Sequence, residues 1–179
     1  MSNQVKGQIN EEVINTLIQL SRGIIGDKAV DSVLRTMKES GEELSGKDIV
    51  FAFADKIQSL FGDKGSYATI RQLGREVAKE LIKNHEKDQW EGLLESGLNT
   101  FGFAYKIERT RQDAYICNCV FYEILNKQGL KPIEHCVCWA GWGFIEGFIR
   151  VLEEDVKSIK WVDRNIKEEK CKFIFVKEL

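Results

Sequence analysis

Apolar residues recur every three or four positions in four successive stretches of the first half of the chain: residues 11–21, 27–40, 45–61 and 65–83. This is the spacing of amphipathic helices that bury one face. Gly62 separates the third stretch from the fourth, and glycine commonly stands where a helix ends. The first half therefore predicts three or four helices that pack against one another.

The second half of the chain has the two-residue alternation of half-buried strands. Four short segments are predicted as strands: residues 101–107, 114–117, 157–163 and 171–176. Between the second and third of these, the apolar spacing predicts a short helix over 120–128 and a longer one over 138–152. Helices followed by strands predict an α+β fold. In it, N-terminal helices pack on an antiparallel sheet that encloses the small-residue and aromatic helix at 138–152.

The composition narrows the class of protein. With 179 residues, 43% of them hydrophobic and 30% charged, the chain has the make-up of a soluble globular domain. A net charge of −2 with interspersed acidic and basic residues argues against nucleic acid as a partner. No apolar run reaches the roughly 20 residues of a membrane span. Residues 1–6 show no signal-peptide pattern, so we expect a cytoplasmic protein with reduced cysteines.

Four of the five cysteines form two C-x-C pairs, Cys117 with Cys119 and Cys136 with Cys138. In extended or turn backbone, residues two apart project to the same side, so each pair could supply two ligands to one ion. Two such pairs would complete a tetrahedral thiolate site, with His135 as a replacement for one sulfur. Zinc is the expected metal, with iron as the alternative. Two other interpretations stay open: plain buried thiols, or a reversibly oxidised pair.

The helix predicted at 138–152 combines glycines with aromatic residues. Glycines four positions apart on a helix allow another backbone or a ligand to approach closely. We therefore predict a pocket for a small apolar molecule, lined by Trp139, Trp142, Gly143, Phe144, Gly147, Phe148, Phe101 and Phe103. An aromatic stripe on a helix is also the usual composition of a core. Glu146, the ionisable residue of this run, is interpreted as facing solvent, with a ligand contact or a role as a base as the alternatives.

Several short motifs follow one another in an order that is typical of a known family. Residues 61–66, Phe-Gly-Asp-Lys-Gly-Ser, lead into a helix that contains Gly-Arg at 74–75. A cysteine motif at 117–119 precedes Cys138, and Cys-Lys-Phe follows at 171–173. In these features the chain resembles, from about residue 25 to 176, the 4-vinyl reductase-like domain family, also called predicted hydrocarbon-binding proteins. That family often has a further cysteine in a Cys-x-Ala element. The corresponding region here lacks it, so the ligand set implied by the resemblance is incomplete.

The resemblance implies a ligand-binding fold shared with NO-signalling and Golgi-transport proteins, often dimeric, with an apolar ligand and sometimes a metal. We divide the chain into an N-terminal helical segment, 1–24, and a ligand-binding domain, 25–179. The predicted function is a small-molecule binding or sensor protein that forms a homodimer. One alternative is a thiol- or zinc-dependent enzyme, a ring-opening hydrolase or a reductase, that uses Cys138 or Cys119 with Glu146. The other alternative is a dimeric interaction scaffold.

Overall fold

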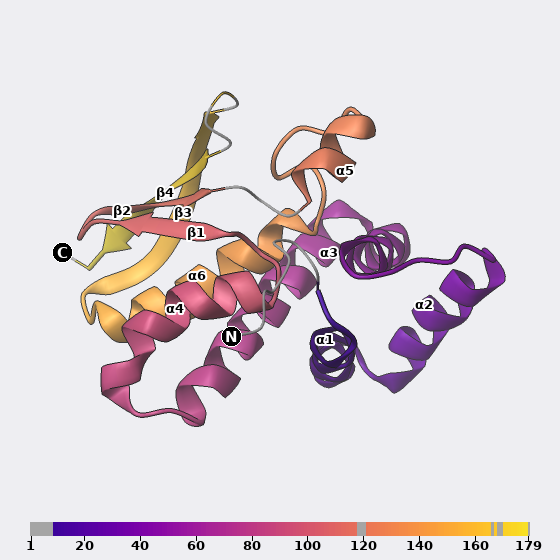
Figure 1. Ribbon diagram of the computed structural model, residues 1–179, viewed down its shortest axis with the longest axis horizontal. Coiled ribbons are helices and arrows are strands. Elements are labelled where there is room, and N and C mark those ends of the chain that lie inside the picture. Colours follow the sequence, from indigo (N-terminus) through magenta and orange to yellow (C-terminus); the bar gives the residue numbers. More distant parts are fainter. Residues whose placement is uncertain (1–8, 118–120, 166, 168–169, 179) are drawn as a thin grey trace, which may run out of the picture.

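The computed structural model describes residues 9–117, 121–165, 167 and 170–178, with the backbone alone at 115–117 (Figure 1). The helical elements in chain order are α1 (Glu11–Ile25), α2 (Asp27–Glu39), α3 (Lys47–Lys83), the short 3-10 helix η1 (Lys87–Gln89), α4 (Trp90–Thr100), α5 (Tyr122–Lys127) and α6 (Cys138–Leu152). The strands are β1 (Lys106–Arg109), β2 (Asp113–Cys117), β3 (Val156–Asn165) and β4 (Lys170–Lys177).

The four strands form one antiparallel sheet in the order β1-β2-β4-β3. One face of the sheet lies against α6, where Phe173 and Phe175 of β4 are buried. The opposite side of α6 packs on α3, so α6 is sandwiched between the sheet and the helices (Figure 1). The predicted α+β fold, with N-terminal helices and an antiparallel sheet that encloses the small-residue helix, is confirmed.

Helix α3 contains a kink that divides it into two helical segments. Gly62 has φ 69° and ψ 177°, a conformation that interrupts the helix and that side chains with a Cβ rarely adopt. The first half of α3 packs with α2 and the second half packs on α6, while α1 lies along both halves (Figure 1). The break predicted at this glycine is therefore present, and it turns the chain from one layer of the molecule to the next.

The strand predicted at 101–107 is the main difference in secondary structure, because only residues from Lys106 onward are extended. Helix α4 precedes it and ends in a Schellman motif, in which Phe103 N–H donates to the carbonyl of Leu98 and Gly102 has φ 70°. Phe101 and Phe103 are buried on either side of this left-handed glycine. Their alternation with glycine imitates the two-residue period of a strand, although it belongs to a helix end.

Helices α3 and α6 touch through their backbones. A Cβ added at Gly143 would overlap the carbonyl group of Arg71, and one added at Gly74 would overlap that of Ala140. A Cβ at Gly147 would come within 2.7 Å of the Ala78 side chain. The close approach expected at the α6 glycines is thus made by α3, and it fixes the distance between the two layers.

Candidate functional site

The predicted thiolate site depends on Cys136, which lies in the core against α3. Its side chain is fully buried, and its Sγ–H donates to the carbonyl oxygen of Ala54 over 3.1 Å. Burial raises the pKa of this thiol to about 12. Since a metal binds the thiolate and not the thiol, the environment of Cys136 opposes metal binding.

Cys136 and Cys138 do not form a two-sulfur clip. The residue between them, Val137, has helical dihedral angles (φ −56°, ψ −32°), and Cys138 begins α6. Two residues apart on a helix, side chains diverge: Cys136 faces α3, whereas Cys138 lines a cavity beside the sheet. Within the described residues no group of three or more His, Cys, Asp and Glu could hold a metal ion. The side chain of Cys117 and all of Cys119 lie outside those residues, so their role as ligands stays a prediction.

His135, proposed above as a substitute ligand, is buried and has several partners. Its ring stacks on Phe51 at 4.3 Å between centroids. Nδ1 accepts a hydrogen bond from Val137 N–H over 3.2 Å, and Nε2 lies 3.5 Å from a carboxylate oxygen of Asp55. Burial lowers the pKa of this imidazole. The residue therefore stabilises the chain where it enters α6.

Glu146 does not face solvent, so that interpretation is wrong. Its side chain is 3% exposed and accepts hydrogen bonds from two arginines of α3. Arg71 donates from Nε over 3.1 Å and from Nη2 over 2.9 Å, and Arg75 donates from Nε over 2.6 Å. Arg71 also lies over the ring of Trp142, 4.4 Å from its centroid. The carboxylate is saturated by charged partners, and it ties α6 to α3.

The aromatic residues of α6 that were predicted to line a pocket are packed against one another and against α3. Phe144 and Phe148 are fully buried. Trp139 stacks between Tyr67 and Trp142, with centroid distances of 4.8 Å and 4.5 Å. The space beside Gly143 and Gly147 is occupied by α3. These side chains form the interior of the α3–α6 layer, and the cavities of the molecule lie elsewhere.

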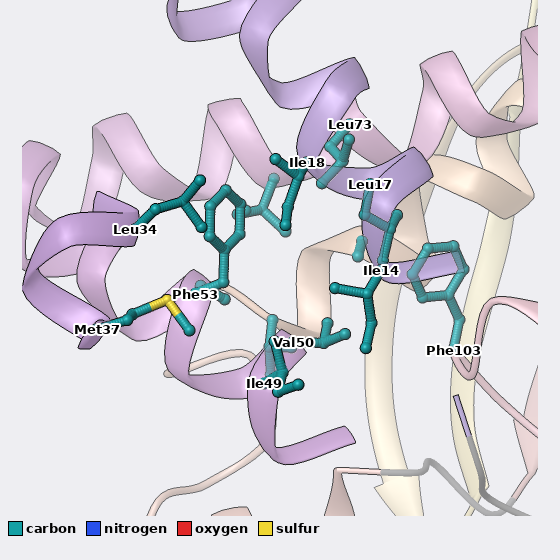
Figure 2. Close-up of a pocket in the computed structure, with 14 residues that line it drawn as sticks. Ile14, Leu17, Ile18, Leu34, Met37, Ile49, Val50, Phe53, Leu73 and Phe103 are labelled. Carbon is teal, nitrogen blue, oxygen red and sulfur yellow. The ribbon is translucent and has the colours of Figure 1, made fainter. Parts of the chain in front are cut away.

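An apolar cavity of about 30 Å³ lies between the N-terminal helices; we call it the helical cavity (Figure 2). Its walls come from three helices and two further segments: Ile14, Leu17 and Ile18 of α1, Leu34 and Met37 of α2, Ile49, Val50, Phe53, Ala54, Ile70 and Leu73 of α3, Phe103, and Val137 and Ala140 at the start of α6. The labelled side chains point toward one another from all sides (Figure 2). The sequence pattern marked the inner faces of these helices, but a pattern does not distinguish a packed face from a cavity wall.

A second cavity of about 30 Å³ lies on the other side of α6, next to β3, β4 and α5; we call it the sheet cavity. Cys138, Trp161, Arg164 and Cys171 contribute to its wall. Phe103, one of the predicted ligand contacts, borders both cavities.

The fold defines an α+β protein in which, among the described residues, one cavity lies between the N-terminal helices and another lies between α6 and the sheet. No family model matches the chain, and no curated protein does. Among solved structures, the chain is similar to an H-NOX family protein that is described in terms of haem distortion. The TM-score is 0.58 at 15% sequence identity, over 98% of this chain and 96% of that chain.

This likeness establishes the fold. It agrees with the α+β architecture that the resemblance implied, whereas ligand binding and membership of the 4-vinyl reductase-like family stay predictions. In the described part of the chain, no helix combines the length and the hydropathy needed to cross a membrane. The homodimer and the cytoplasmic location stay predictions as well.

Proposed function

We propose that the protein binds a small uncharged apolar molecule in the helical cavity and acts as a binding or sensor module. The observation that carries this proposal is the chemistry of the cavity wall, where every side chain ends in hydrocarbon or, at Met37, in a thioether. An apolar cavity of this kind stays dry and takes up apolar molecules, because water finds no hydrogen-bond partner there. A charged ligand would be buried without a partner, which is costly.

The ligand must gain space from movable walls, because about 30 Å³ is room for roughly two water-sized spheres. Leu34 and Met37 of α2 are half-buried, and α2 is the outermost helix (Figure 1). The methionine side chain is flexible and adapts its shape to neighbours. A small displacement of α2 would therefore enlarge the cavity without disturbing the α3–α6 layer.

Haem, the group named for the H-NOX protein, does not fit this wall. Haem iron is held by an axial histidine, cysteine, tyrosine or methionine. Among the described residues that line the helical cavity, only Met37 has such an atom, and none has a cation to pair with the carboxylates of haem. His135 is engaged with Phe51 and Val137. The proposal is accordingly for a ligand without a metal.

Binding of benzene, an uncharged apolar molecule of six heavy atoms, tests the proposal by saturation-transfer NMR. The wild type should show a saturable transfer signal, and Ile18→Trp, which fills the wall of the cavity, should weaken binding by about tenfold or more. Leu20→Trp is the matched control, since Leu20 is also half-buried on α1 but lines a shallow groove on another side. Equal binding by the wild type and Ile18→Trp would overturn the proposal, as would a shifted and sharpened Soret band that saturates at one haemin per chain.

A further inference from the structure

The sheet cavity owes its chemistry to an irregularity in β3. Trp161 pairs with Phe173 of β4, and Arg164 pairs with Cys171, so Val162 is an extra residue that makes a β-bulge. In a regular strand, residues three apart point to opposite faces. The bulge removes this difference, because the two β4 partners are two residues apart and share a face. Trp161 and Arg164 therefore both line the sheet cavity.

Both side chains bring hydrogen-bond donors that have no acceptor. The indole Nε1 of Trp161 and the Nε and Nη2 of Arg164 are shut off from solvent, and they have no hydrogen-bond partner in the described part of the chain. The guanidinium lies over the ring of Tyr122, 4.1 Å from its centroid, which holds its plane in place. Buried donors without partners are rare in folded proteins and each needs a reason.

The other tryptophans show that the indole of Trp161 is exceptional. Trp90 Nε1 donates to the carbonyl of His85. In the same way, Trp139 Nε1 donates to Ile133 and Trp142 Nε1 donates to Ile159, over 3.2 Å and 3.1 Å. Three of the four indoles in the sequence thus have a backbone acceptor. The fourth indole, that of Trp161, has no acceptor in the described part of the chain, and Trp161 lines the sheet cavity.

We propose that the sheet cavity is a second binding site, and that it takes a short-chain carboxylate. The carboxylate oxygens would accept from Arg164 and Trp161, and the hydrocarbon end would contact Phe173 and other apolar walls. A guanidinium edge presents two parallel donors, which match the two oxygens of a carboxylate. A cavity of about 30 Å³ has room for a molecule of only a few heavy atoms, which favours a short chain. The proposal for the sheet cavity does not rest on the proposed function of the helical cavity, although Phe103 and Val137 border both.

Titration with propionate, followed by the indole N–H signals in a 1H–15N NMR spectrum, tests the proposal. The signal that Trp161→Phe removes is assigned to Trp161, and the other three serve as internal references for the fold. Propionate should shift the Trp161 signal in a saturable way. 1-Propanol, which has the same chain without the charge, and sodium chloride at equal ionic strength should shift it far less.

Substitution of the arginine completes the experiment. Arg164→Met keeps the length of the side chain and removes its donors, so propionate should bind about ten- to one-hundred-fold more weakly. Arg150→Met, at an exposed residue of α6, should bind as the wild type does. Arg164→Lys keeps the charge without the two parallel donors, and its affinity should lie between those of the wild type and Arg164→Met. A Trp161 signal that propionate leaves unchanged, or that shifts equally in Arg164→Met, would overturn the proposal.

Discussion

The contact between α3 and α6 makes a sharp prediction for the substitution Gly143→Ala. The new Cβ would lie 2.8 Å from the carbonyl carbon of Arg71 and nearer still to its oxygen. Because both groups belong to helix backbones, the helices would have to separate by roughly 1 Å, and overpacking of this kind costs about 1–3 kcal/mol. The separation would also lengthen the hydrogen bonds between Arg71 and Glu146. Because the added Cβ would overlap backbone atoms, we take the upper end of this cost, about 3 kcal/mol. Alanine recovers about 1 kcal/mol through its higher helix propensity. We therefore expect a net loss of stability of about 2 kcal/mol.

Thermal and urea unfolding measure this loss. For a chain of this size, about 2 kcal/mol corresponds to a melting temperature lower by roughly 4–8 °C. Gly23→Ala is the matched control: Gly23 is also helical, but a Cβ there would meet no atom within 4 Å. That variant should gain about 0.5–1 kcal/mol. If both substitutions changed stability in the same direction, the backbone contact would not govern the packing of the two layers.

Three further predictions concern buried polar groups. Glu146→Gln should lower the free energy of unfolding by about 2–3 kcal/mol, which is less than the cost for a fully buried ion pair because both arginines reach solvent. Glu154→Gln, at an exposed residue, is the control and should change the free energy of unfolding little. Equal stability of the two variants in urea would contradict this prediction. With its pKa at about 12, the Cys136 thiol should resist iodoacetamide at pH 8 in the folded protein, so mass spectrometry should count equal labels on the wild type and Cys136→Ser. The stability from this raised pKa is fully present below pH 9 and is lost as the pH rises toward 12, by about 1.4 kcal/mol per pH unit. Cys136→Ser should lack this loss, and an equal fall in both proteins would refute its assignment to this thiol.

The sequence predicts those elements whose pattern is local. Helix α6 runs over 138–152 as predicted, and β2 and β4 agree with their predicted ranges to within one residue at each end. Helix α4 was missed, because its Schellman ending alternates apolar and small residues as a strand does. The boundary predicted at residue 24 stays a prediction, although α1 packs on α3 and lines the helical cavity.

The candidate sites depend on contacts that a linear pattern does not contain. Glu146 contacts Arg71 and Arg75, which lie more than 70 positions before it in the sequence. No residue near Glu146 in the sequence indicates that its charge is buried. Arg164 faces inward only because one residue bulges out of β3. The C-x-C spacing at Cys136 predicted a clip, but the helical turn there separates the two sulfurs. Local periodicity therefore predicts the helices and strands, whereas the partners of the buried polar side chains depend on the packing of the helices and the sheet.

Phe103 and Val137 form the partition between the helical cavity and the sheet cavity, since each borders both. A ligand in one cavity that displaces the Phe103 ring toward the other cavity would change the shape of that second cavity. By thermodynamic linkage, if the first ligand changes the affinity for the second by some factor, the second ligand changes the affinity for the first by the same factor. One aromatic ring at the end of α4 thus gives this small fold the means to make two occupancies depend on each other.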